Sequence, residues 1–368
     1  MKRILIALVV LVVLIIVVAV VYTPDEQPVE TPQFPAITAN DLKRIEIHRR
    51  EGTGDNAKEF DVVLEKDGGE WKMTKPVEYA AKQASVDRMA GHIAKLDPVD
   101  VVASSSDLHQ EYELTDDLAV HVKASGAQDK EIELLLGIMR NGHTFARKPG
   151  EDRVFRLRGM LRSAFSSSPS NYRDKTIFRL DDKRIDRVKF SNENGVLEFA
   201  KTDGIWSPVG REIKNFNYRK LEGLLSSLSG LNTRDFMDGK PTVEESGITP
   251  DADFVWFHLE PAKEGDAGVT EPSEEHILYL GGEHAETRTV YARKDKNPQH
   301  FLLSKHMIER LKVKAEDFAR TDEEMKKEAE RNAQGAMRDL DANPLDGTKG
   351  TFIRPEFREE FKRKMQKQ

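Results

Sequence analysis

Two arginines lie in nearly identical four-residue motifs and are the side chains best suited to bind an anion. Phe-Ala-Arg-Lys occupies 145–148 and Tyr-Ala-Arg-Lys occupies 291–294. The guanidinium groups of Arg147 and Arg293 can hold a carboxylate through two parallel hydrogen bonds, which would make a ligand or partner contact. The alternative is a strand whose aromatic ring packs inward while the basic residues face solvent or pair across a sheet. Because the motif occurs twice, we favour this shared structural role.

Trp71 and Trp206 form a second repeated pair, and an indole ring can stack on a sugar. Each follows a charged turn that contains glycine, at 67–70 and at 203–205. A tryptophan at the same place in two repeats fits packing between a helix and a sheet, because its large ring supplies much apolar area. Sugar binding needs further polar groups around the ring, and the neighbouring sequence gives no sign of them. We therefore favour packing and keep both residues as ligand contacts to be tested.

The remaining sequence offers no catalytic, metal or cofactor motif. The absence of cysteine excludes thiolate zinc sites, iron–sulfur clusters, thiol catalysis and a lipid anchor on an N-terminal cysteine. The ten histidines show no metal-ligand spacing, and the densest cluster, at 283–286, lies in an expected hairpin turn. A calcium-like segment at 339–350 has Pro344 and Gly350 where such a loop requires Gly and Glu. We predict no enzyme activity, catalytic residue, metal or cofactor, with a hydrolase built from unlinked carboxylates as the alternative.

Composition narrows the class of protein further. The chain has 368 residues, of which 38% are hydrophobic, and a net charge of −7. At about 100–200 residues per domain, this length predicts two or three domains. The acidic balance argues against a nucleic-acid partner, because nucleic-acid binding relies on a basic stripe.

An unbroken apolar run at 4–22 predicts a membrane anchor. As a helix it is about 28 Å long, close to the thickness of a bilayer's hydrocarbon core. Lys2 and Arg3 precede the run and Asp25 and Glu26 follow it. The positive-inside rule then places the N-terminus in the cytoplasm and the bulk of the chain in the periplasm, on a single pass through the inner membrane. A cleaved signal peptide is the alternative, but its apolar region would be shorter, about 7–15 residues.

An internal duplication fills most of the remaining chain. When Trp71 is aligned on Trp206, apolar residues at five positions match without a gap, with the spacing of one face of an amphipathic helix. They are Val86, Met89, Ala90, Ile93 and Leu96 in the first copy and Leu221, Leu224, Leu225, Leu228 and Leu231 in the second. Leu-Gly at 136–137 and 280–281 also matches. The conserved order makes chance an inadequate explanation.

Each copy has the strand pattern of an antiparallel sheet. Alternating or β-branched segments, bounded by Gly, Asp, Asn and Pro, predict strands on both sides of the helix. They cover 42–48, 60–66, 119–122, 132–136, 144–147 and 154–157 in the first copy, and 185–191, 196–201, 253–259, 276–280, 289–293 and 300–303 in the second, with a short strand at each Trp. The predicted fold class is α+β, a mainly antiparallel sheet with a helix packed on one face.

These patterns divide the chain into five predicted segments. They are an anchor at 1–23, a Pro-rich acidic linker at 24–40, a first α+β repeat at 41–167, a second at 168–318 and a charged helical tail at 319–368. A capping box at 321–324 opens the tail helix. Near its end, Phe357 and Phe361 begin a narrow apolar stripe on a basic helix. The stripe fits docking to a partner or an anionic surface, and it equally fits a frayed terminus.

The chain resembles a family of bacterial membrane-anchored proteins, the domain of unknown function number 4340. The likeness covers roughly 39–319. It rests on Ile-Glu-Ile at 45–47 after the anchor, Trp71 with Pro76, Leu-Gly before Phe-Ala-Arg, Val-Phe at 154–155, and Tyr-Arg-Asp-Lys at 172–175 opening the second unit. Members tend to be encoded beside ABC transporters of the gliding-motility auxiliary type, so the resemblance implies an accessory role at the envelope. It supplies no catalytic residue.

Duplicated structure without duplicated chemistry predicts a binding function. We expect a non-enzymatic, membrane-anchored extracytoplasmic scaffold or accessory protein with a protein partner in the envelope, namely ABC transporter subunits. The alternative is a module that binds cell-wall or polysaccharide fragments in a cleft between the repeats.

Overall fold

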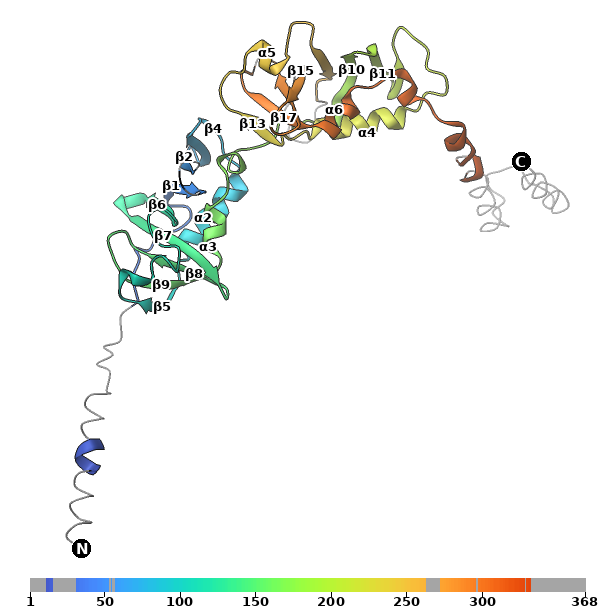
Figure 1. Cartoon of the computed structure of the whole chain (residues 1–368). Helices are drawn as coiled ribbons and strands as arrows, with labels where there is room; N and C mark the ends of the chain where they lie inside the picture. Colours follow the sequence, from blue (N-terminus) through green and yellow to red (C-terminus); the bar gives the residue numbers. More distant parts are fainter. Residues whose placement is uncertain are drawn as a thin grey trace, which may run out of the picture. The chain divides into compact units, whose positions relative to one another are not determined.

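A computed structural model describes residues 11–15, 31–52, 54, 57–262, 272–295, 297–327 and 329–331. The chain divides into two compact units, Met1–Lys175 and Thr176–Gln368. Figure 1 labels many of their elements. Residues 11–15 are helical, whereas the rest of the predicted anchor at 4–22 lies outside the described residues. Across the described part of the chain, no helix is both long and apolar enough to cross a membrane.

The first unit is built on a nine-stranded antiparallel sheet in the order β4-β3-β2-β1-β6-β7-β8-β9-β5. Its strands are β1 (Leu42–Glu51), β2 (Lys58–Asp67), β3 (Glu70–Lys75), β4 (Tyr79–Ala80), β5 (Pro98–Ala103), β6 (Val120–Gly126), β7 (Glu131–Arg140), β8 (His143–Arg147) and β9 (Val154–Arg158). Two helices accompany them, α2 (Gln83–Ala94) and α3 (Leu161–Phe165).

The second unit repeats this plan with eight strands in the order β12-β11-β10-β14-β15-β16-β17-β13. The strands are β10 (Ile185–Asn192), β11 (Gly195–Thr202), β12 (Ile205–Pro208), β13 (Asp235–Met237), β14 (Asp253–Leu259), β15 (Glu274–His284), β16 (Thr289–Lys294) and β17 (His300–Ser304). The helices are α4 (Tyr218–Ser229), α5 (Val243–Ser246) and α6 (Lys305–Leu311).

The two strand orders correspond one to one except for β4, which has no counterpart. The predicted α+β class and the internal duplication are therefore confirmed, and every predicted strand forms. Sequence patterns missed β5 and β13, which pair with the last long strand of their sheets, β9 and β17. Only three residues form β13, too few for a visible alternation.

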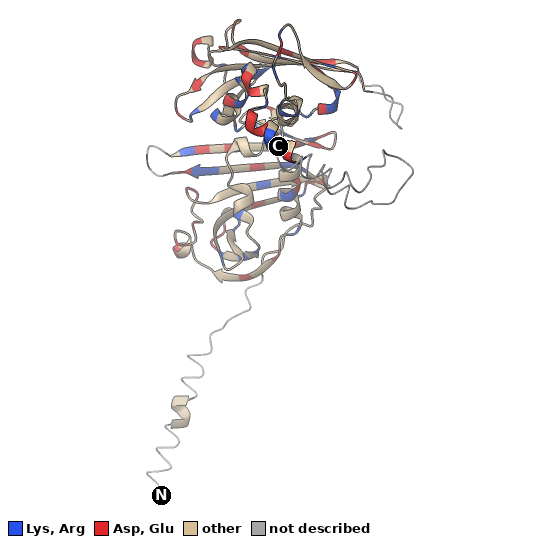
Figure 2. Ribbon diagram, turned by 90° about the vertical axis from the view of Figure 1, so that its right-hand side faces the viewer, with Lys and Arg blue, Asp and Glu red and all other residues tan. Residues whose placement is uncertain are grey.

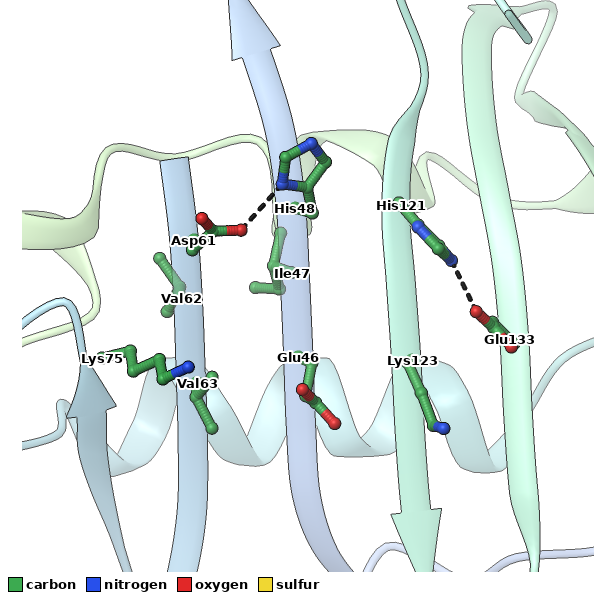
Figure 3. Close-up of a pocket in the computed structure, with 10 residues that line it drawn as sticks. All are labelled: Glu46, Ile47, His48, Asp61, Val62, Val63, Lys75, His121, Lys123 and Glu133. Carbon is green, nitrogen blue, oxygen red and sulfur yellow. Dashed lines mark hydrogen bonds and ion pairs between the residues drawn. The ribbon is translucent and has the colours of Figure 1, made fainter. Parts of the chain in front are cut away.

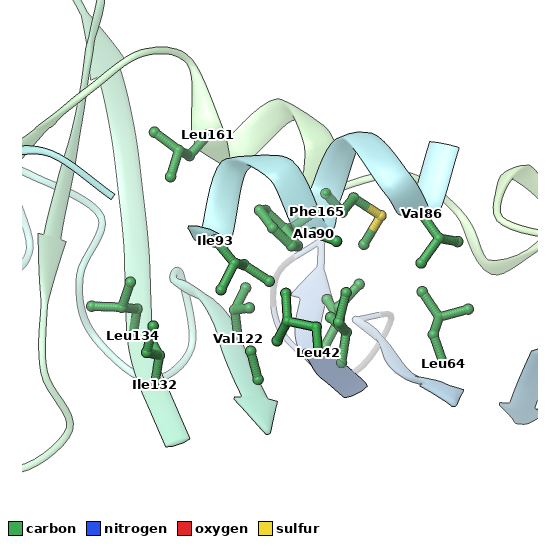
Figure 4. Close-up of a cluster of buried hydrophobic side chains, with 14 of the residues drawn as sticks. Leu42, Leu64, Val86, Ala90, Ile93, Val122, Ile132, Leu134, Leu161 and Phe165 are labelled. Atoms are coloured by element: carbon green, nitrogen blue, oxygen red, sulfur yellow. The ribbon is translucent and has the colours of Figure 1, made fainter. Parts of the chain in front are cut away.

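One face of each sheet is buried beneath helices. In the first unit, α2 turns Val86, Met89, Ala90 and Ile93 onto the sheet, as the helical spacing predicted. Figure 4 shows Val86, Ala90 and Ile93 packed above Leu42, Leu64 and Val122, with Leu161 and Phe165 of α3 beside them. Each fully buried Val, Ile or Met contributes about 1.5–3 kcal/mol relative to an exposed one.

The core of the second unit is richer in aromatic rings. Phe199 contacts Phe318 with ring centroids 4.8 Å apart, and Phe178 contacts Phe257 at 5.0 Å. Both pairs meet edge to face, the arrangement that the charge distribution of the rings favours. The α4 residues Leu221, Leu224, Leu225 and Leu228 are buried, in agreement with the predicted helix face.

Glycines at matching places let a covering segment approach both sheets. A Cβ on Gly137 would lie 2.1 Å from the carbonyl oxygen of Tyr112, and a Cβ on Gly281 would lie 2.1 Å from that of Ser246. Both glycines sit where the strand register shifts, in β7 and β15. The repeated Leu-Gly pair therefore marks a bulge over which backbone passes at a distance that no other residue allows.

The boundary between the units falls after Lys175, whereas the Ser-rich composition at 166–173 predicted it after Ser167. Tyr172 is buried in the core of the first unit, and its hydroxyl donates to the carbonyl of Ala164. Burial raises the pKa of the Tyr172 phenol to about 12. The backbone carbonyl of Tyr172 accepts from Lys82 at 2.7 Å. The segment 172–175 thus closes the first unit and does not open the second.

The second unit closes in the same way. The backbone carbonyl of Phe318 accepts from Asn217 at 2.7 Å, which matches the bond between Tyr172 and Lys82. The bridge between Phe216 and Ala319 likewise matches the bridge between Ala81 and Arg173. The tail then begins as predicted, because Thr321 accepts from the amide of Glu324 while the Glu324 carboxylate accepts from the amide of Thr321. The described helical residues of the tail are 322–327 and 329–331.

Candidate functional site

The first unit presents an open, charged sheet face opposite its helices. Strand alternation turns Ile45 and Ile47 inward to the core and Glu46 and His48 outward. The same alternation on β2, β6 and β7 produces a polar outer surface. Figure 2 shows acidic and basic residues interspersed along the strands. We call this surface, formed by Glu46, His48, Asp61, Lys75, His121, Lys123 and Glu133, the open face of the first unit.

Two histidines lie side by side at the centre of the open face. His48 and His121 are direct partners in the register of β1 and β6. Each ring pairs with a carboxylate on its far side: His48 Nδ1 lies 2.7 Å from Asp61, and His121 Nε2 lies 2.8 Å from Glu133 (Figure 3). The four side chains thus form one row across four adjacent strands. They line a shallow hollow of about 310 Å³.

A second row of alternating charges crosses the open face below the histidines. Glu46 lies in register opposite Lys123 on β6, and its carboxylate accepts from Arg44 Nε at 3.0 Å. The hydrogen bond from Arg44, with smaller contributions from the charges of Lys123 and Lys75, holds the pKa of Glu46 below its usual value, against the opposing effect of burial. Glu46 therefore stays ionised and the row keeps both signs of charge at neutral pH.

This lowered pKa predicts a pH-dependent contribution to stability. A carboxylate with a depressed folded-state pKa stabilises the fold above its unfolded pKa, and the effect disappears as the pH falls through the folded value. Glu46→Gln should therefore lower the free energy of unfolding near pH 7, by less than about 1 kcal/mol because the group is partly solvated. The difference from wild type should shrink as the pH falls below the ordinary Glu pKa of 4.5 and vanish below the lower folded-state pKa.

Urea unfolding at a series of pH values measures this difference. Glu59→Gln, at an exposed position of the same β2 strand as Asp61, is the control and should show no comparable trend. A Glu46→Gln effect that is equal at pH 7 and pH 3 would contradict the ionic origin.

The other half of the same sheet surface is covered. Arg147, a predicted contact residue, is buried there, with Nε donating to the carbonyl of Leu114 at 2.7 Å and Nη2 pairing with Asp116 at 2.8 Å. Leu114 packs with Leu135, Phe145 and Val154 in a small apolar cluster. Arg147 therefore holds the covering loop onto β8, and its hydrogen bonds are used within the fold.

Arg293 has different surroundings, although its motif is the same. Its guanidinium lies over the ring of Tyr279 at 5.1 Å and borders a hollow of about 340 Å³. Among the described residues, no carboxylate lies within ion-pair distance of it. The lysine that follows keeps a common role in both motifs, because Lys148 lies over Phe34 and Lys294 lies over Phe178.

The two repeated tryptophans are packing residues. Trp71 is 1% exposed and Trp206 is 4% exposed, which leaves neither ring face open to a sugar. The indole Nε1 of Trp71 donates to Asp87, and its backbone exchanges two hydrogen bonds with the Gln83 side chain. These bonds tie β3 to the start of α2.

The remaining predicted positions give no site in the described residues. Phe357 and Phe361 lie outside them. The polar cluster at 283–286 is engaged locally, with Glu283 paired to Lys305 and His284 bonded to Thr287. No group of three or more His, Asp or Glu within the described ranges is placed to hold a metal ion.

The central row of the open face is particular to the first unit. In the second unit the position of His48 is taken by Ser191, whose register partners are Val196 and Phe254 in place of Asp61 and His121. Sequence patterns missed this row. The alternation that turns these side chains outward was visible in the sequence. The row forms only through the register between β1 and β6, which the sequence does not reveal.

Fold and surface together define a class: a tandem α+β protein in which each sheet has one face beneath helices and the other partly covered. Residues 71–252 match the family described as a domain of unknown function (DUF4340), which confirms the resemblance to that family predicted from the sequence. The match runs from β3 to the residue before β14, a shorter span than the predicted 39–319. No curated protein and no solved structure matches the chain.

Proposed function

We propose that this protein is a non-enzymatic accessory protein of the bacterial envelope. It is anchored in the inner membrane through residues 4–22, with both units in the periplasm, and it binds a protein partner of an ABC-type transporter. The apolar run and its flanking charges support the anchor. The observation that carries the binding function is the open face of the first unit, a polar sheet surface with paired charges of both signs.

The shape and charge of the open face favour a protein partner. Its hollow is shallow and its rows span at least four strands, which suits an extended surface better than an enclosed small molecule. Charges of both signs in fixed register can be matched by a complementary surface, and such matching gives specificity. The second unit lacks the histidine row, so recognition by this surface belongs to the first unit.

The tail has a defined start that supports a role in partner contact. Lys220 of α4 donates to the carbonyl of Ala319 at 2.9 Å and pairs with Glu324 at 3.1 Å. These bonds fix the direction in which the chain leaves the second unit. We propose that Phe357 and Phe361, further along, contribute a helical docking stripe.

Crosslinking of the full-length, membrane-embedded protein, followed by mass spectrometry, tests this function. We expect wild type to recover one set of envelope proteins that includes transporter subunits. Lys123→Glu, on the open face, should reduce that recovery. Arg88→Glu makes the same change of charge on the solvent side of α2 and should leave it intact. Recovery of no specific protein by wild type would overturn the proposal, and glycan adducts in place of proteins would favour a cell-wall or polysaccharide fragment binding module.

A further inference from the structure

We propose that the second unit contains a binding site for an external carboxylate, formed by the cross-strand row Tyr279, Arg293 and His300 together with Lys240. These residues border one hollow or contact its arginine directly. The site goes beyond the proposed function, because it lies in the other unit and does not require the open face of the first.

The first unit supplies a template for this site. The close approach of Tyr112 to Gly137 matches that of Ser246 to Gly281, and in both cases the second residue after the carbonyl packs on the same glycine: Leu114 in one unit and Ile248 in the other, each 2.9 Å from the built Cβ. The covering segments therefore make matching contacts up to this point.

Two residues after Leu114 and Ile248, the residue types of the two segments differ. Asp116, which pairs with Arg147, follows Leu114 by two residues, and Pro250 follows Ile248 by two. Both segments then turn at a threonine, where Ala119 donates to Thr115 and Ala252 donates to Thr249. Arg293 thus occupies the position that corresponds to Arg147, but the second unit has Pro250 where the first unit has the carboxylate of Asp116.

The neighbours of the arginine have also become polar. The register places Tyr279 and His300 on either side of Arg293. In the first unit the register partner of Arg147 is the apolar Leu135, which packs with Val154 at the start of β9. The Tyr279 ring holds the guanidinium by a cation–π contact. Burial and the charge of Arg293 lower the pKa of His300, so that this ring remains neutral and can accept or donate a hydrogen bond.

The lining of the hollow indicates the kind of ligand. Lys240 and Arg293 supply positive charge, whereas Val243, Ile248 and Pro298 supply apolar surface. A guanidinium favours a carboxylate because it can donate two parallel hydrogen bonds to it. In the first unit the corresponding arginine, Arg147, binds the carboxylate of Asp116 through one such bond, at 2.8 Å. The matching ligand is therefore a carboxylate carried on a short apolar stem, either a small molecule or a side chain of another protein.

Arginine-selective labelling of the full-length protein in membranes tests the site. The protein is treated with phenylglyoxal, and labelling of each arginine is followed by peptide mass spectrometry. Arg147 is the internal reference and should react slowly, because its nitrogens are bonded within the fold. Arg293 should react faster, and 4-methylpentanoate should abolish its labelling. The neutral amide of the same acid should not protect it, and inorganic phosphate should protect it less well.

A variant supplies the internal competitor. Pro250→Asp restores a carboxylate at the place of Asp116 and should suppress Arg293 labelling without any added ligand. Protection of the wild-type protein gives an independent measurement if this variant does not fold. The proposal fails if Arg293 reacts as slowly as Arg147, if acid and amide protect equally, or if phosphate protects and the acid does not.

Discussion

Gly137→Ala is expected to destabilise the first unit by about 3 kcal/mol or more, the upper range for overpacking. The added Cβ would lie 2.1 Å from the carbonyl oxygen of Tyr112 and 2.9 Å from Leu114 Cγ. The backbone cannot retreat cheaply, because the amide of Ile138 donates to that same Tyr112 carbonyl at 2.9 Å. The substitution must therefore move the covering loop away from the sheet and break the hydrogen bond between Arg147 and the carbonyl of Leu114.

Chemical denaturation of the purified full-length variant measures this loss. Gly91→Ala, within α2, is the matched control, because its Cβ would meet no atom within 4 Å. Alanine in a helix interior is favoured over glycine by about 0.5–1 kcal/mol, so this variant should be slightly more stable than wild type. Gly281→Ala, with Gly223→Ala as its control, should repeat the result in the second unit. Equal stability of Gly137→Ala and Gly91→Ala would contradict the close approach.

Trp71→Ala is expected to cost about 3–5 kcal/mol, the usual range for removing a buried aromatic side chain. The ring is enclosed between the sheet and α2, and its loss leaves a cavity together with the unpaired Asp87 partner. Trp71→Phe should recover much of the loss, because it refills most of the cavity. Trp206→Ala should behave similarly in the second unit.

The third tryptophan is the control for this series. Trp256 is half-buried on the outer face of β14, where Lys189 lies over its ring at 5.6 Å. Trp256→Ala should therefore cost far less than Trp71→Ala in urea unfolding. If Trp71→Ala left stability unchanged but removed binding of a glycan, the packing role would be wrong and the sugar-contact interpretation would be right.

The strands and helices of each unit could be predicted because apolar residues recur along them with a regular spacing. Alternation marked β1 and β10, and the spacing of apolar residues marked α2 and α4. Repetition strengthened both, since two copies of one pattern are rarely coincidental. The two compact units divide after Lys175 and not after Ser167, because Tyr172, in a segment whose Ser-rich composition suggested a linker, is buried in the core of the first unit.

The surface chemistry was less predictable, because it depends on which strands become neighbours. The repeated arginines suggested one shared role, but the role of Arg147 depends on Asp116 and that of Arg293 on the absence of a carboxylate at Pro250. Neither covering residue lies near its arginine in the sequence. The row of His48 and His121 was missed for the same reason, because residues far apart in sequence form it through the register.

The measurement that tests the central claim most directly is site-specific photo-crosslinking of the full-length protein in intact cells. A photoreactive amino acid is placed at His48, on the open face, or at Arg88, on the solvent side of α2. The account predicts a discrete protein adduct from His48 that is absent from Arg88. The same adducts from both positions, or none from His48, would contradict the assignment of the open face as the surface that binds a partner.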